Sequence, residues 1–136
     1  FYDYHMHSNF SNDSKADMKY DKRSIDLGLK EICFTDHVDY DLDSDDSFGI
    51  DYNKYFDKIQ SLQNKYKDNI SIKKGIEIGL QKQIIDKCNN DIINILLFCN
   101  MSQHAINRSE LYFGNFFLDK TQHEAYEYYY KELYDI

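Results

Sequence analysis

The sequence contains no proline and only five glycines among its 136 residues. These residues usually mark turns and element ends, so boundaries have to be read from clusters of Asn, Asp and Ser instead. The length suits a single hydrophobic core, and we expect residues 1–136 to form one domain. Residue 1 is Phe rather than Met and the last residues follow a helical pattern, so we expect the chain to be truncated, above all at its C-terminus.

Basic residues are in the minority. Sixteen Lys and Arg stand against 24 Asp and Glu, which gives a formal net charge of −8, and no basic run occurs. Nucleic acids are held chiefly by clustered Lys and Arg, so this balance disfavours a nucleic-acid partner. An acidic protein that handles a phosphate must supply positive charge locally, and bound metal ions do so more strongly than any side chain.

Long apolar runs and paired cysteines are also missing. The longest apolar stretch, residues 95–99, is far too short to cross a bilayer, and no signal-peptide pattern opens the chain. The three cysteines show no CxxC or CxxxC spacing, which excludes a zinc knuckle or redox pair of that kind. We expect reduced, mostly buried thiols in a soluble, cytoplasmic protein with no membrane partner.

Strand and helix patterns alternate along the chain. Apolar alternation or continuous apolar runs predict strands at residues 2–7, 31–37, 70–80 and 92–99. Helical spacing predicts helices at residues 19–29, 50–66 and 82–88, and a last helix behind a capping box of Thr121 and Glu124. This alternation implies an α/β fold with a mostly parallel sheet, either open or curled into a barrel. Function then gathers at the C-terminal ends of the strands.

His5 and His7 stand two residues apart in the first predicted strand. Side chains at this spacing project from the same face of a strand, so both can reach one metal ion. The alternative is a pair of surface histidines on an edge strand. The motif alone leaves both interpretations open.

Further ligand-type residues follow the other predicted strands. His37 closes the Thr-Asp-His triplet at the end of the second strand, and Asp36 beside it can orient it. His104 follows the last predicted strand by a few residues. Asp13, in the loop after the first strand, can either cap the next helix or turn toward a metal. His123, among polar residues at the start of the last helix, is expected at the surface.

Glu77 lies between two isoleucines in the third predicted strand. A buried carboxylate is costly without a positive partner, and a metal ion is one such partner. The alternative is a salt bridge to Lys73 or Lys74, of which only Lys73 faces the same side of the strand. We favour the metal. A site rich in nitrogen and oxygen and without thiolates suits zinc, manganese or iron.

The segments DYHMHS, FSNDS, GLKEICFTDH, KKGIEIGL and SQH, in this order and spacing, resemble the PHP (polymerase and histidinol phosphatase) family, most closely its histidinol-phosphate phosphatase branch. The resemblance runs over essentially the whole chain. It implies a distorted, TIM-like (β/α) barrel, of which this chain would form about the first four β/α units as a partial barrel. It also implies up to three divalent metal ions as cofactors.

The metal ligands implied by the resemblance are His5, His7, Asp13, His37, Glu77 and His104. In the family pattern the histidine pair of the first strand holds one ion, the glutamate bridges two, and the late histidine binds the second of these. The aspartate and the histidine of the triplet hold the third. The family's later ligands, a further histidine and a C-terminal Asp-x-His, have no counterpart here, so we expect an incomplete set.

The function that the resemblance implies is hydrolysis of a small phosphomonoester, most of all L-histidinol phosphate, in histidine biosynthesis. The metal ions would provide the nucleophile and neutralise charge on the phosphoryl oxygens. Asp36 and Arg108 are the further candidates for catalytic roles, and Arg108 can contact the substrate phosphate or form a surface salt bridge. The alternatives are a PHP phosphoesterase acting on nucleotides, a half-barrel that binds metal without turnover, and a plain α/β domain with incidental histidines. An unpaired sheet edge would favour a homo-oligomer.

Overall fold

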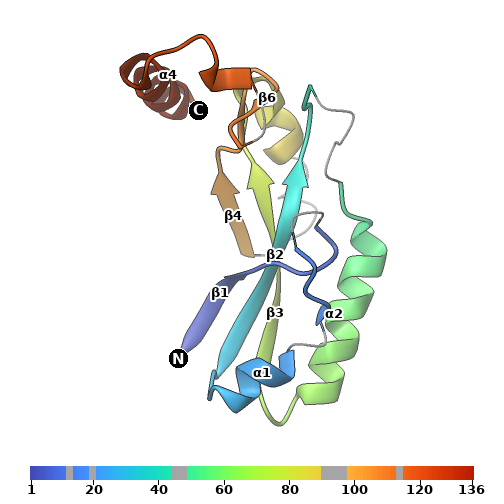
Figure 1. The fold of residues 1–136 in the computed structure, drawn as a ribbon. Helices are drawn as coiled ribbons and strands as arrows, with labels where there is room; N and C mark the ends of the chain where they lie inside the picture. The colour runs from blue at the N-terminus through green and yellow to red at the C-terminus, as the bar shows by residue number, and fades with distance from the viewer. Residues whose placement is uncertain (12–13, 19–20, 44–48, 90–97, 113–114) are drawn as a thin grey trace. The chain divides into compact units, whose positions relative to one another are not determined.

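The structure, a computed structural model, describes residues 1–11, 14–18, 21–43, 49–89, 98–112 and 115–136. Strands and helices alternate over most of this length (Figure 1). The elements are β1 (Tyr2–Met6), α1 (Asp21–Asp26), β2 (Glu31–Asp39), α2 (Tyr52–Tyr66), β3 (Ser71–Gly79), the 3₁₀ helix η2 (Lys82–Ile84), β4 (Phe98–Ser102), β5 (Ala105–Ile106), β6 (Ser109–Glu110), the 3₁₀ helix η3 (Asn115–Phe117) and α4 (Gln122–Asp135).

Four parallel strands form one sheet in the order β1-β2-β3-β4, and β5 pairs with β6 as an antiparallel hairpin. The α/β class predicted from the sequence is therefore confirmed. In the pairing of β1 with β2, the register shifts between Asp3 and Met6. An irregularity of this kind re-aims the side chains beside it, and here it falls at His5.

The chain divides into two compact units. The first comprises Phe1–Val38, Phe48–Glu77 and Leu97–Asn100, and the second comprises Asp39–Ser47, Ile78–Leu96 and Met101–Ile136.

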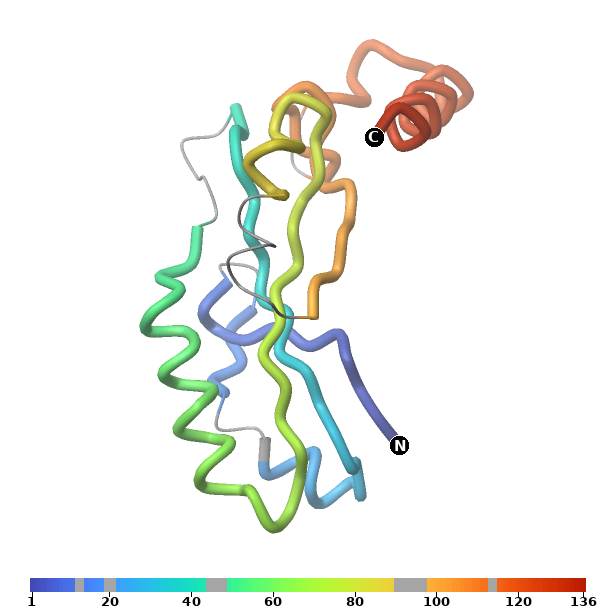
Figure 2. Tube along the Cα trace, turned by 180° about the vertical axis from the view of Figure 1, so that it is seen from behind, coloured from blue at the N-terminus to red at the C-terminus, as the bar shows by residue number. Residues whose placement is uncertain are grey.

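In the first unit, α2 lies along the sheet (Figures 1 and 2). The carboxylate of Asp51 caps the helix start by accepting a hydrogen bond from the backbone of Lys54. The buried residues Tyr55, Ile59 and Leu62 recur at helical spacing and form the inner face of the helix, which the sequence predicts at residues 50–66. Hydrophobic burial of this face, together with polar contacts described below, fixes the helix against β2 and β3.

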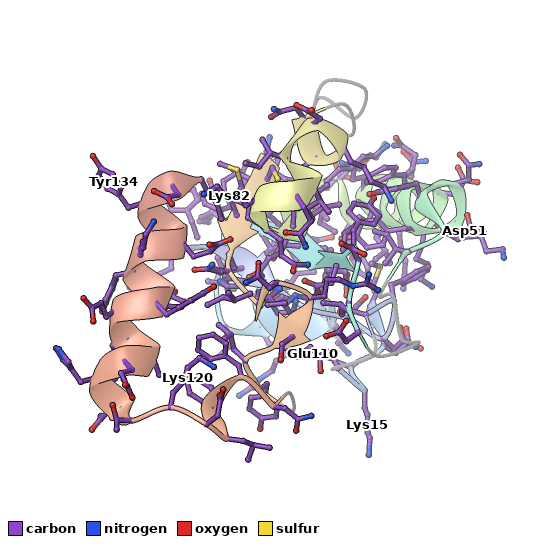
Figure 3. All side chains as sticks on the ribbon, turned by 90° about the horizontal axis from the view of Figure 1, so that it is seen from above. Lys15, Asp51, Lys82, Glu110, Lys120 and Tyr134 are labelled. Carbon is purple, nitrogen blue, oxygen red and sulfur yellow. The ribbon has the colours of Figure 1, made fainter. Side chains whose placement is uncertain are left out.

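In the second unit, α4 begins at the predicted capping box. Thr121 and Glu124 exchange side chain to backbone hydrogen bonds in both directions. Ala125 of this helix joins a small core with Ile106 of β5 and Phe116 of η3. The outer face carries aromatic residues, and Figure 3 shows Tyr134 extending away from the helix.

The sequence expectations on cysteines agree with the structure. All three are free, and Cys33 and Cys88 are buried. Burial raises the pKa of the Cys33 thiol to about 12, so this thiol is unreactive at neutral pH. Within the described residues, no helix has the length and apolar character needed to cross a membrane.

Several element boundaries differ from the prediction, and β2 continues to Asp39 instead of ending at residue 37. The strand predicted at residues 92–99 is observed as β4, which continues to Ser102, and residues 92–97 lie outside the described part of the chain. The continuous apolar run ends at Cys99 and Asn100 follows it, while the strand continues, so the polarity pattern alone misplaced this boundary. The helix predicted at residues 19–29 ends at Asp26, because Gly28 adopts a left-handed φ of 76° that terminates it.

The β5–β6 hairpin is an element that the sequence did not predict. Its turn residues, Asn107 and Arg108, have φ values of 48° and 70°. Tight hairpin turns with two left-handed residues usually contain glycine, and here the second position is Arg. The usual turn signal is therefore missing from the sequence.

Candidate metal centre

The first unit brings two histidines onto one carboxylate. The Nε2 atom of His5 lies 2.5 Å from Oε2 of Glu77, and Nε2 of His7 lies 3.4 Å from the same oxygen. The three ligand atoms all lie within 4.8 Å of one another. β1 thus presents both imidazoles from one face, as their spacing of two residues requires.

The donor set of this cluster fits a divalent metal ion. Glu77 is only 2% exposed, whereas the side chain of His5 is 57% exposed. A divalent cation can bind these atoms together, because neutral imidazole and ionised carboxylate are ligands of zinc, manganese and iron. One buried carboxylate and one accessible imidazole leave a route for the ion to enter.

The lysines that might have neutralised Glu77 have other partners. The ammonium of Lys73 lies 3.2 Å from Glu31, and that of Lys74 donates to Gln60 at 3.2 Å. The structure places the imidazoles of His5 and His7 against this buried carboxylate. Both lysines of the salt-bridge alternative pair elsewhere, and a metal ion at Glu77 stays a prediction.

His37 adds a third imidazole to the first unit. Its ring stacks on that of His7, with centroids 4.3 Å apart and an interplanar angle of 13°. His5 meets His7 edge-on, at 4.9 Å and 61°. The sequence predicted all three as ligands, and the packing of the three rings fixes the planes in which their nitrogen lone pairs lie.

Asp36 is fully buried, and its carboxylate faces the loop after β1. It accepts hydrogen bonds from the backbone and hydroxyl of Ser8, at 2.6 and 2.9 Å. It also accepts from the backbone and hydroxyl of Ser11, at 3.3 and 2.7 Å. Neighbouring residues of a strand point to opposite faces, so the carboxylate serves this loop and not the ring of His37. Asp13, further along the same loop, lies outside the described residues.

His104 lies in the second unit beside Asp39, the last residue of β2. Nδ1 of His104 is 2.8 Å from Oδ1 of Asp39. Gly79 makes room for the pair: a Cβ at this position would lie 2.9 Å from Nδ1 of His104 and would overlap the carboxylate of Asp39. The sequence pattern ended the strand at residue 37 and did not single out Asp39. The signal was its place two residues after His37, the same spacing as in the first histidine pair.

Arg108 occupies the β5–β6 turn in the second unit. Its Nε atom lies 3.1 Å from Asp43 and 3.4 Å from Asp41, and its backbone N–H donates to Gln81 at 2.7 Å. These ion pairs match the salt-bridge alternative considered from the sequence. A contact of Arg108 with a substrate phosphate stays a prediction.

A comparison with protein families matches residues 3–136 to the PHP domain. Among curated proteins, the histidinol-phosphatase of Lactococcus lactis subsp. lactis (strain IL1403) is 39% identical over 126 residues, which cover 90% of this chain and 46% of that protein. The probable histidinol-phosphatase of Clostridium acetobutylicum is 31% identical over 137 residues, which cover 97% of this chain and 50% of that protein.

A solved structure is also similar. It is the crystal structure of histidinol phosphate phosphatase from Lactococcus lactis complexed with zinc, L-histidinol and phosphate. It matches with a TM-score of 0.91 and 36% sequence identity, over 98% of this chain and 52% of that chain. The similarity confirms the predicted partial (β/α) barrel. The chain spans about half the length of the relatives that it matches.

Proposed function

The chain belongs to the PHP domain family, and on that premise we propose that it acts as a metal-dependent phosphomonoester hydrolase of the histidinol-phosphatase type. The proposed reaction splits L-histidinol phosphate with water into L-histidinol and phosphate, a step of histidine biosynthesis. Two curated relatives carry the name histidinol-phosphatase, and the solved relative holds zinc, L-histidinol and phosphate. The observation on this chain that carries the proposal is the convergence of His5, His7 and Glu77.

His5, His7 and Glu77 would hold one divalent ion, and His37, Asp13 and His104 are the further proposed ligands. When bound, such ions supply a Lewis-acidic centre that activates water and neutralises phosphoryl oxygens. The chain's own side chains would provide the ligand atoms for these positive ions. Two imidazoles converge on one buried carboxylate, and the formal net charge of −8 disfavours a phosphate ester where no cation is present.

Arg108 is proposed as a group that contacts the substrate phosphate. Its Nε atom is paired with Asp41 and Asp43, but a guanidinium has further N–H donors on its Nη atoms. The two carboxylates would then hold the guanidinium in place while the Nη donors face the phosphate. Both roles considered from the sequence are therefore compatible with the observed ion pairs.

The test is phosphate release from L-histidinol phosphate by the purified chain, with zinc, manganese or iron added or removed. His7→Ala should lower release by at least about 100-fold, because it removes a ligand rather than a neighbour of one. His123→Ala is the matched control, since His123 is exposed on α4, as the sequence predicts. Release that survives both a chelator and His7→Ala would refute the proposal.

The second candidate is a metal-binding half-barrel without turnover. It is supported by the convergence of His5, His7 and Glu77, which by itself requires only that a metal ion binds. Metal binding that depends on His7, without phosphate release from any ester, would support it. A substrate panel with nucleotides in the same assay separates the histidinol-phosphate activity from that of a nucleotide phosphoesterase.

A further inference from the structure

Three consecutive residues of β2 in the first unit, Thr35, Asp36 and His37, make three different kinds of side-chain contact. The hydroxyl of Thr35 bonds to both backbone groups of Met6 in β1, accepting at 3.2 Å and donating at 3.4 Å. The carboxylate of Asp36 holds the loop that follows β1. The ring of His37 stacks on His7. This short stretch therefore ties β1 and its loop to β2 at the residues on either side of His7, Met6 and Ser8.

Tyr55 of α2 acts on the same stretch from the helix. Its side chain is fully buried, and its hydroxyl accepts a hydrogen bond from the backbone N–H of Asp36 at 3.3 Å. The hydroxyl donates to the backbone carbonyl of Gly75 in β3 at 3.0 Å. β2 and β3 are neighbours in the sheet, so the hydroxyl bridges two backbone groups of adjacent strands. It holds these groups farther apart than a direct N–H to O=C bond would.

The ring of Tyr55 also reaches the loop that Asp36 holds. It meets the ring of Phe10 edge-on, with centroids 5.3 Å apart. The backbone N–H of Phe10 donates to the hydroxyl of Ser8, which in turn donates to Asp36. The loop of residues 8–11 is thus fixed by a carboxylate at one point and by an aromatic ring at another.

We propose that Asp36 and Tyr55 are positioning residues of the metal centre, which set the spacing of its ligands and hence its affinity for a divalent ion. The inference rests on the metal site proposed above. Asp36 holds Ser8, the residue directly after His7. The hydroxyl of Tyr55 binds the backbone just before His37 and two residues before Glu77.

The energetic reason is that neither side chain can move without breaking the buried hydrogen bonds that it makes. Asp36 is buried with four hydrogen-bond donors from Ser8 and Ser11, so its charge is compensated within the fold and needs no metal. Groups that support metal ligands in this way typically change metal affinity by about 10- to 100-fold when they are removed. A site that holds its ligands loosely loses affinity even when all ligands are present.

Tyr55→Phe tests the inference because it removes the hydroxyl and keeps the ring contact with Phe10. The backbone groups of Asp36 and Gly75 then either pair directly or lose their partner, and both outcomes displace Glu77. The dissociation constant for zinc, measured by competition with a chromophoric chelator, should rise by about 10-fold or more. Tyr66→Phe makes the same change at the end of the same helix, where the side chain is half-exposed, and should leave the constant unchanged.

An unchanged zinc affinity in Tyr55→Phe, with only a lower melting temperature, would reduce Tyr55 to a structural role and overturn the inference. A wild-type chain that binds no zinc would instead refute the metal site itself. If Tyr55→Phe does not fold, Ser11→Ala removes one donor from Asp36 with little change in volume. It should also weaken zinc binding severalfold, whereas Ser61→Ala, exposed on α2, should not. Equal affinities in these two serine variants would overturn the inference as well.

Discussion

The imidazoles of His7 and His37 lie nearly parallel, 4.3 Å apart between ring centroids, although one follows β1 and the other belongs to β2. Stacking orients each ring through its face, and the nitrogen atoms lie in the ring plane. Packing and metal binding therefore use different parts of the same side chain. A substitution can remove one and keep the other.

His37→Phe should keep the stack on His7 but lose a metal ligand. We expect the melting temperature of the metal-free protein to stay near the wild-type value, because the flat aromatic surface is conserved. The amount of metal bound per chain, measured by elemental analysis after dialysis, should fall. His37→Ala is the matched comparison, and it should lower both quantities. Full metal content in His37→Phe would remove His37 from the ligand set.

Glu31 should make stability depend on pH in the acid range. The hydroxyl of Tyr4 donates to it at 2.6 Å, Ser71 donates at 2.7 Å, and Lys73 lies close by. These contacts, the hydrogen bond from Tyr4 first, lower the pKa of Glu31 from 4.5 to about 2. A lowered folded-state pKa contributes stability above the unfolded value, and this contribution is lost as the pH falls from about 4.5 toward 2.

Glu31→Gln should therefore be less stable than wild type at neutral pH, and the gap should close as the pH falls through that window. Urea unfolding midpoints at a series of pH values measure the gap. The contact is largely open to solvent, so we expect a modest effect that shrinks in high salt. Glu127→Gln, exposed on α4, is the control. A gap that stays constant with pH would contradict the role given to Glu31.

Gly79→Ala should disturb the pair formed by Asp39 and His104. The added methyl group would overlap the Asp39 carboxylate and crowd Nδ1 of His104, so at least one of them has to move. We expect lower phosphate release with a smaller change in stability. Gly49→Ala adds the same group where no atom of the described residues lies within 4 Å, and it should be nearly neutral. Equal activity of the two variants would show that the pair can shift without consequence.

Thr121→Ala should destabilise the second unit through α4. The hydroxyl of Thr121 accepts the hydrogen bond that closes the first turn of this helix. Loss of such a cap typically costs about 1 kcal/mol of unfolding free energy. Gln122→Ala, at the next position and exposed, is the control. Chemical denaturation followed by circular dichroism would show the difference, and equal midpoints would argue against the cap.

What the sequence could predict depended on how local the signal was. The histidine pair and Glu77 could be singled out, and the structure places them together, because strand periodicity and the cost of a buried carboxylate act within a few residues. The boundary of β4 and the turn at Asn107 were missed. Backbone pairing that is accompanied by neither glycine nor an apolar pattern gives little signal in the sequence. Such elements are decided by contacts with distant strands.

The contacts of Asp36 and Tyr55 were also beyond what local sequence patterns could predict. The helical pattern predicted the helix that carries Tyr55, but not that its hydroxyl would reach two strands. Asp36 was expected to orient His37 because it is adjacent in sequence. Strand alternation sends its carboxylate instead to Ser8 and Ser11, which only the folded loop brings near. Side-chain partners distant in sequence require the three-dimensional structure.

The most direct test of the central claim is X-ray absorption spectroscopy of the zinc-loaded chain. If His5, His7 and Glu77 hold the ion, its first shell contains only nitrogen and oxygen at about 2.0–2.2 Å, with outer-shell scattering from imidazole rings. Glu77→Gln should weaken or abolish that spectrum. A shell of sulfur near 2.3 Å, or water oxygen without imidazole scattering, would contradict the metal centre described here.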